Sequence, residues 1–343
     1  INGVVIRMNM MRFTTMKTKL RKYPSIFLIL LLAISSCFLT GCVNQHPKDS
    51  KKSSQGESVE TMLEITDPKE KQAVLNAKAK VKALSGNPRI VATSPAVADI
   101  CDKLDLDLVG VPKSSVSKIP SRYKKVKKVG LAMSPDMEIV SSLNPDWILA
   151  PSSLETDLKP KFEELKNTEY AFLNLRSVQG MYRSAQELGE IFGKQQEAEK
   201  MTKEFTTFYK SYTKRNKNKK HPKALVLMGL PGSYVIATEN SYVGSLVKLA
   251  GGENVYQNTD QEFLTVNTED MKKKEPDIIV RAAHALPDQV TKMFNEDFET
   301  NDIWKHFDAV KNGRVYDLTY ENFGMSATFR YPKALEELQP ILY

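Results

Sequence analysis

From about residue 89 onward, the sequence alternates between short apolar runs and segments in which apolar residues recur at helical spacing. Short apolar runs are typical of buried strands, and two parallel strands need a crossover segment, which is usually a helix. The alternation therefore predicts a parallel α/β sheet. The elements expected before residue 178 are strands at 90–92, 108–111, 147–150 and 171–175, and helices at 96–104, 137–143 and 158–165.

A second stretch of the same kind follows a polar break at 214–222. The elements expected there are strands at 224–228, 234–237, 277–280 and 314–317, and helices at 243–250, 289–294 and 332–342. Because the alternation stops and then restarts, we predict two α/β lobes rather than one.

One long helical pattern, from about 178 to 212, separates the two stretches. Its apolar residues, among them Met181, Phe192, Phe205 and Tyr212, recur at steps close to three or four. At roughly 1.5 Å per residue, a single helix of this length would measure about 50 Å. We therefore expect one helix that connects the two lobes.

Both lobes contain the same short motif. Glu138 stands seven residues before a Pro-Asp pair at 145–146, and Glu269 stands seven residues before a Pro-Asp pair at 276–277. In each case an apolar strand follows the pair, so proline and aspartate are explained as boundary residues between a helix and a strand. The matching glutamates are not explained in that way.

The N-terminus has the plan of a signal peptide, in which a basic segment is followed by an apolar stretch, here at 26–34. Residues 39–42, Leu-Thr-Gly-Cys, resemble the lipobox of bacterial lipoproteins, which implies cleavage before Cys42 and acylation, with palmitate for example, of that cysteine. A plain transmembrane helix is the alternative, but the apolar stretch is shorter than the roughly 20 residues that span a bilayer. The methionines at 8–16 are possible translation starts, so we assign no function to the residues before them.

The segment after Cys42 is polar and predicts a tether, and Asp67 followed by Pro68 predicts the start of a short helix. We therefore divide the chain into a signal peptide (1–41), a lipidated cysteine with its tether (42–66), a short helical segment (67–87), an N-terminal α/β lobe (88–177), a connecting helix (178–216) and a C-terminal α/β lobe (217–343).

Charge and cysteine content narrow the function classes. The whole chain carries a formal charge of +8, but the first 41 residues hold six basic and no acidic residues, so the remainder is near +2. A net charge near +2, with no recognisable nucleic-acid-binding motif, argues against nucleic-acid binding. Of the three cysteines only Cys101 would remain free, which excludes a disulfide framework and predicts a buried, inert thiol.

The lipobox, the tether, the two lobes and the repeated Glu-x6-Pro-Asp motif together resemble the substrate-binding lipoproteins of ABC importers for metal chelates. Within that group, the segments 220–234, 241–255 and 301–310 look most like the haem receptor of the iron-regulated surface determinant system. The resemblance implies two Rossmann-like α/β lobes joined by one long rigid helix, a class III periplasmic-binding-protein-like fold. It also implies a receptor for iron acquisition and not an enzyme.

The resemblance further implies that haem b is held non-covalently between Met133 and His284, because that family ligates haem iron with a methionine of one lobe and a histidine of the other. Thioether sulfur and imidazole nitrogen are both competent axial ligands. From the residues alone, a packing role for Met133 remains open, and His306 is a reserve ligand expected to be half-buried. Thr93, Ser94 and Tyr242 stand where helices begin and are candidate contacts for the haem propionates, although helix capping explains such hydroxyl residues equally well.

The family also implies partners and a location. We expect Glu138 and Glu269 to dock onto an ABC permease, haem to be handed over by surface haem proteins, and a monomer anchored by lipid at the extracytoplasmic face of the membrane of a Gram-positive bacterium. The main alternative is a receptor for a ferric siderophore of the hydroxamate type, or for another metal chelate. A membrane-tethered enzyme is disfavoured because the sequence holds none of the common catalytic motifs, and a zinc or manganese receptor because its histidines are scattered.

Overall fold

The computed structural model describes residues 59–115 and 117–343. The first sheet has the strand order β3-β2-β1-β6-β7, and every neighbouring pair is parallel. Its strands are β1 (Ile90–Ala92), β2 (Leu108–Val111), β3 (Lys127–Lys128), β6 (Trp147–Pro151) and β7 (Glu169–Leu173). The predicted parallel sheet is confirmed, with β7 beginning and ending two residues earlier than expected.

Helices cover both faces of the first sheet. Successive residues of a strand point to opposite faces, so neighbouring residues of β1 contact different helices. Ile90 belongs to the same buried cluster as α3 and α6, whereas Val91 packs with α4 and α5. The four helices are α3 (Pro95–Lys103), α4 (Met137–Ser142), α5 (Glu155–Glu163) and α6 (Val178–Phe192). Short additional elements are η1 (Ser121–Tyr123), η2 (Ser152–Leu154) and the hairpin of β4 (Gly130–Leu131) and β5 (Ser134–Pro135).

The second sheet is mixed. Its main order is β11-β9-β8-β12-β13, and β10 pairs with the first residues of β8. The pairs of β8 with β12 and of β12 with β13 are parallel, whereas β9 is antiparallel to both β8 and β11. Its strands are β8 (Lys223–Leu230), β9 (Ser233–Ala237), β10 (Glu253–Asn254), β11 (Phe263–Leu264), β12 (Ile278–Ala283) and β13 (Val315–Asp317).

The helices of the second sheet also lie on two faces. Residues of α8 and α12 share a buried cluster with Ala224 and Val226, and residues of α9 and α10 share another with Leu225 and Leu227. The elements are α8 (Tyr242–Ala250), α9 (Thr268–Lys273), α10 (Pro287–Thr300), η3 (Asp302–His306), α11 (Asp308–Lys311) and α12 (Tyr331–Leu342).

The expected single helix from 178 to 212 is wrong, because two helices occupy this segment. The first, α6, ends at Gly193, whose φ of 72° lies in the left-handed region that a helix cannot continue through. The second, α7 (Gln195–Asn216), packs against α6, and the rings of Tyr182 and Phe205 stack at 4.8 Å. With 22 residues, α7 is about 33 Å long.

The helix α7 is the connection between the two sheets. Near its start, Lys194 donates to Asp105 of the first half at 3.0 Å. Near its end, the hydroxyl of Tyr212 donates to the carbonyl oxygens of Leu335 at 3.1 Å and Ala250 at 3.3 Å. One cluster of buried side chains runs from the first sheet through α6 and α7 to α8, α12 and the second sheet. The expected pair of α/β lobes joined by a long helix is therefore confirmed, with α7 as that helix.

Further contacts join the two halves directly. The backbone N–H of Ala327 donates to the carbonyl oxygen of Leu175 at 2.7 Å. Arg176, which follows β7, forms an ion pair with Glu262, which precedes β11, with 2.8 Å between Nε and Oε1. Burial raises the pKa of Glu262, and Arg176 offsets part of that rise.

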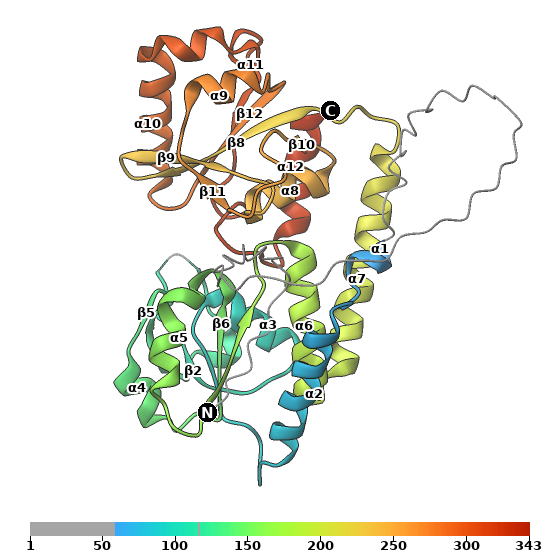
Figure 1. Cartoon of the computed structure of the whole chain (residues 1–343), viewed down its shortest axis with the longest axis vertical. Helices are drawn as coiled ribbons and strands as arrows, with labels where there is room; N and C mark the ends of the chain where they lie inside the picture. Colours follow the sequence, from blue (N-terminus) through green and yellow to red (C-terminus); the bar gives the residue numbers. More distant parts are fainter. Residues whose placement is uncertain (1–58, 116) are drawn as a thin grey trace, which may run out of the picture. The chain divides into compact units, whose positions relative to one another are not determined.

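Two helices precede the first sheet, α1 (Val59–Met62) and α2 (Pro68–Lys82). Figure 1 shows α2 beside α6, with which it packs. Val59 and Leu63 are buried, so the segment expected as tether (42–66) is already part of the folded protein from residue 59. The expected signal peptide (1–41) and Cys42 lie outside the described residues. Within the described part, no helix is both long and apolar enough to cross a membrane.

Candidate functional site

Met133 lies at the turn of the β4–β5 hairpin, and 68% of its side chain is exposed. Backbone hydrogen bonds hold the hairpin in place, from Lys113 N to Gly130 O and from Asp136 N to Val129 O, both 2.7 Å long. Gly130 has a φ of 94°, and a Cβ there would lie 2.8 Å from the nitrogen of Asp136. Met133 is therefore not a core residue but an accessible thioether on a constrained turn.

His284 follows β12 directly and extends its pairing, since its backbone N–H donates to the carbonyl oxygen of Gly229 at 2.9 Å. The imidazole is half-buried, and this burial lowers its pKa. The ring is then neutral at neutral pH, which is the form in which histidine ligates a metal. The position is also the one where α/β sheets bind ligands, at the carboxyl end of a parallel strand.

Leu286 stands two residues beyond His284 and was not predicted as a site residue. Its φ of 46° is left-handed, which costs a leucine about 1–2 kcal/mol. Its carbonyl oxygen accepts from the N–H groups of Gln289 and Val290, so Leu286 begins the helix α10. Its side chain is 53% exposed, as is 58% of Leu131, which stands two residues before Met133. Leu131 and Leu286 each stand two residues from an expected iron ligand along the sequence, and this spacing is the signal by which they could have been predicted.

The cation nearest to His284 along its strand is not free to bind an anion. Arg281 is buried in β12 and forms two hydrogen bonds with the carboxylate of Asp317, at 2.7 and 2.6 Å. Its guanidinium also donates to Asn295 and lies over the rings of Phe294 and Phe298. Arg281 therefore belongs to the packing of α10 on the sheet.

The three residues expected to contact haem propionates are all buried. The Thr93 hydroxyl donates to the carbonyl oxygen of Leu149 at 3.3 Å, and the Ser94 hydroxyl accepts from the N–H of Val97 as the N-cap of α3. Tyr242 is the first residue of α8 and is likewise buried. Because none of the three offers an accessible group, they are left out of the candidate site.

Glu138 and Glu269 occupy the same position in two matching helices. Each is the second residue of a six-residue helix, α4 or α9, and each is exposed. The helix N-caps are also alike, because the side chain of Asp136 accepts from the N–H groups of Glu138 and Ile139, and that of Asn267 accepts from the N–H of Asp270. The sequence repeat thus corresponds to a structural repeat with one exposed carboxylate in each half.

The other two histidines of the described residues, His221 and His306, have simpler environments. His221 is exposed, and its Nδ1 lies 2.6 Å from the carbonyl oxygen of Gly251. His306 is exposed, which corrects the expectation that it is half-buried; only Trp304 and Phe307 beside it enter the core. Cys101 is a buried free thiol whose pKa is raised to about 12 by burial, as predicted for an inert cysteine. In the described residues, no group of three or more metal-binding side chains occurs.

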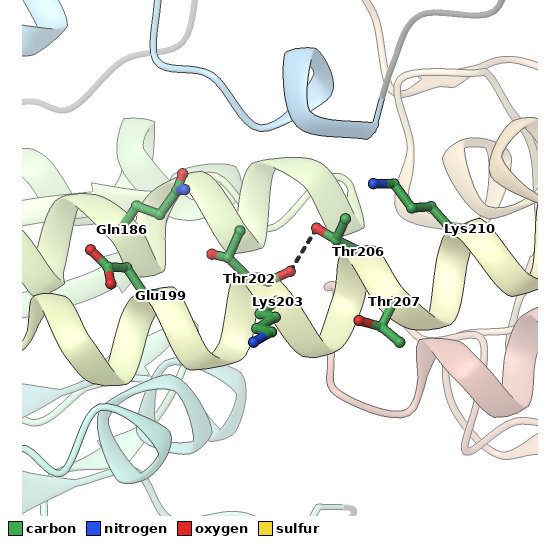
Figure 2. A pocket seen from close by; sticks show the side chains of 7 residues that line it. All are labelled: Gln186, Glu199, Thr202, Lys203, Thr206, Thr207 and Lys210. Carbon is green, nitrogen blue, oxygen red and sulfur yellow. Dashed lines mark hydrogen bonds between the residues drawn. The ribbon is translucent and has the colours of Figure 1, made fainter.

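A groove of about 420 Å³ runs along α7 and was not expected from the sequence. Figure 2 shows its lining, which comes from α7 except for one side chain of α6. The residues are Gln186, Glu199, Thr202, Lys203, Thr206, Thr207 and Lys210. None of the expected ligand-binding residues lines it.

Residues 90–321 match the periplasmic binding protein family. The chain belongs to this family. Its members are substrate-binding proteins, so the expectation that the chain is not an enzyme is confirmed, as is the class III fold. The chain is 42% identical over 260 residues to the high-affinity heme uptake system protein IsdE of Staphylococcus aureus, covering 76% of this chain and 88% of IsdE.

Two solved structures are similar in both fold and sequence. An ABC transporter substrate-binding protein from Listeria monocytogenes is 49% identical, with a TM-score of 0.71, and the match covers 75% of this chain and 99% of that one. The crystal structure of S. aureus IsdE complexed with heme is 41% identical, with a TM-score of 0.70, covering 75% of this chain and all of IsdE. The family predicted from the sequence is therefore the correct one.

Proposed function

We propose that this chain is a lipid-anchored receptor that binds haem and delivers it to an ABC permease for iron acquisition. The observation that carries the proposal is the similarity to IsdE, which extends over most of both chains and includes a structure solved with heme. The family match at residues 90–321 spans both halves of the fold, and Met133 and His284 fall within this range.

In this proposal Met133 and His284 are the axial ligands of a non-covalently bound haem b. The exposure of Met133 and the lowered pKa of His284 support these roles, since one presents a free thioether and the other a neutral imidazole. A sulfur and a nitrogen ligand together would give six-coordinate haem iron. A ligand that is not covalently attached can leave, as a carrier requires.

The test is to titrate the purified protein with hemin and record the Soret band. We expect stoichiometric binding with a six-coordinate spectrum, and Met133→Ala or His284→Ala to shift it toward five-coordinate. Matched controls are His221→Ala and His306→Ala, which remove exposed histidines and should leave the spectrum unchanged. No spectral change with hemin, together with tight binding of a ferric hydroxamate siderophore, would replace haem by the siderophore.

Glu138 and Glu269 are proposed to dock onto basic residues of the permease, one from each half. Their exposure and matched positions support this role. The double variant Glu138→Lys/Glu269→Lys should abolish haem-dependent growth while its hemin affinity stays that of the wild type. Charge reversal at Glu164 and Glu299, which are also exposed, is the control and should not affect growth. Loss of hemin affinity in the first variant would place the two glutamates at the ligand instead.

The lipid anchor on Cys42 is proposed from the lipobox alone. Replacing Cys42 with Ser should abolish the incorporation of labelled palmitate into the protein, with hemin binding retained. Continued labelling of the variant would contradict lipidation at this residue.

A further inference from the structure

Few large apolar side chains are strongly exposed in the described part of the chain, and most of these gather at the proposed haem ligands. Met133 and Leu131 lie in the β4–β5 hairpin, and Leu286 lies in the loop that follows His284. The remaining one is on α2, far along the chain from either loop. The four are Leu75, Leu131, Met133 and Leu286.

Both loops are held in place, so these side chains do not become exposed through loose chain segments. The hairpin is fixed by the backbone bonds of Gly130 and Asp136, and a side chain at position 130 would meet the backbone. Leu286 keeps a left-handed backbone that favours glycine or asparagine, and it begins α10. An exposed leucine on an unfavourable backbone, two residues from a proposed iron ligand, is therefore a candidate ligand contact.

We propose that Leu131 and Leu286 contact the flat apolar ring of the ligand, one from each loop, and thereby select a porphyrin over a hydrophilic ferric chelate. The inference rests on the proposed function and adds to it the residues that recognise the ring. Axial ligands recognise the open coordination positions of haem iron. Apolar contacts recognise the macrocycle, which a hydroxamate siderophore lacks.

Ring contact and iron ligation can be measured separately with iron-free protoporphyrin IX. This probe keeps the apolar ring and gives Met133 and His284 no iron to bind. The variants are Leu131→Asn, Leu286→Asn and their combination, since asparagine is polar, close to leucine in shape and tolerant of a left-handed backbone. The matched control is Leu75→Asn, because Leu75 is 54% exposed, as much as Leu286, but lies on α2.

We expect each substitution at 131 or 286 to weaken protoporphyrin IX binding about tenfold, as the loss of one buried leucine contact predicts. Hemin should dissociate faster from the double variant, measured by transfer to apomyoglobin, with its six-coordinate spectrum intact. Leu75→Asn should bind protoporphyrin IX as the wild type does.

The inference is overturned if the double variant binds protoporphyrin IX as the wild type does, or if Leu75→Asn has the same effect as the other substitutions. A five-coordinate hemin spectrum in the double variant would also overturn it, because the leucines would then act through the iron ligands. Failure of the haem proposal looks different, since the wild-type protein itself would then lack the six-coordinate spectrum. Leucine-dependent binding of protoporphyrin IX would still support ring recognition in that case.

Discussion

Asp146 and Asp277 make the same contact in the two halves of the protein. The Oδ2 atom of Asp146 accepts from the backbone N–H of Arg89 at 2.7 Å, and that of Asp277 accepts from the N–H of Lys223 at 2.8 Å. Each aspartate thus ties the start of one strand to the start of its parallel neighbour. Two residues before each aspartate the backbone is left-handed, at Asn144 with a φ of 43° and at Glu275 with a φ of 48°.

This relationship predicts matched losses of stability. Asp146→Ala and Asp277→Ala should each lower the free energy of unfolding by about 1 kcal/mol, because a solvent-exposed hydrogen bond to a carboxylate is lost in each. Glu138→Ala and Glu269→Ala, in the same motif, should change it by less than about 0.5 kcal/mol. Urea denaturation followed by circular dichroism measures both pairs, and unequal losses for the two aspartates would contradict the structural repeat.

The helix α2 packs on α6, and two carboxyl groups, Glu70 of α2 and Glu187 of α6, are buried there and interact with each other. Burial, followed by Glu70, raises the pKa of Glu187 well above its ordinary 4.5, and Arg183 offsets only part of this. Folded protein therefore keeps a proton on Glu187 at pH values where the unfolded chain has released it. Stability must then fall as the pH rises above about 4.5 and through neutrality.

We expect the wild-type protein to be less stable at about pH 8 than at about pH 6, by on the order of 1–2 kcal/mol. Glu187→Gln should remove most of this dependence and stabilise the protein at the higher pH. The control is Glu190→Gln on the same helix: Lys78 lowers the pKa of Glu190, so that residue is ionised at both pH values in both states. Thermal unfolding at the two pH values gives the comparison, and an unchanged pH dependence of stability in Glu187→Gln would refute the protonation of Glu187 in the folded protein.

Gly193 separates α6 from α7 and is needed for its backbone conformation rather than for space. A Cβ at this position would meet no atom within 4 Å, but its φ of 72° disfavours any residue with a side chain. Gly193→Ala should therefore cost about 1 kcal/mol and leave the fold intact. Gly244→Ala should prevent folding, because its Cβ would lie 1.8 Å from the carbonyl oxygen of Thr238. Equal effects in chemical denaturation would contradict this distinction.

Phe205 fills the centre of the core that joins the two halves. Its ring stacks on Tyr182 and Tyr209 and meets Tyr331 edge-on at 5.6 Å. Phe205→Ala should lower the free energy of unfolding by about 3–5 kcal/mol, as large cavities in cores do. Lys203→Ala, an exposed position on the same helix, should have almost no effect. Two separate unfolding transitions in the wild-type protein would show that the halves do not share this core.

The shared core also predicts little movement on ligand binding. Rotating one half against the other would break the packing around α7, the Tyr212 hydrogen bonds and the Arg176–Glu262 ion pair. We expect the radius of gyration from small-angle scattering to change by less than about 1 Å when hemin is added. A larger decrease would mean that the halves close around the ligand.

Much of the fold could be predicted because the strands follow simple patterns. The apolar runs at 90–92 and 108–111 coincide with β1 and β2, since strands buried on both faces are almost wholly apolar. At β7 the same rule failed by two residues. Leu175 is apolar and buried, but its carbonyl oxygen accepts from the backbone N–H of Ala327 rather than from a neighbouring strand. The apolar run in the sequence therefore continues two residues beyond the end of the strand.

The connection and the site were harder to predict from patterns. The helical spacing of apolar residues continues across Gly193. Both α6 and α7 bury apolar residues at this spacing, so their combined pattern looks like that of one longer helix. Burial of Thr93 and Tyr242 could not be foreseen, since capping residues look the same whether or not a ligand can reach them. The proposed roles of Met133 and His284 came from resemblance, whereas their exposure and burial are structural observations.

The position of α12 within the shared core has a consequence for the order in which the protein folds. Tyr331 and Leu335 on this helix pack against Phe205 and Tyr212, although more than a hundred residues separate the two segments. The strands of the first sheet can pair early, but Phe205 and Tyr212 lack part of their packing until α12 docks. A chain in which α12 has not yet docked therefore presents apolar side chains of α7 to water, and a chaperone that covers α7 would act at that stage.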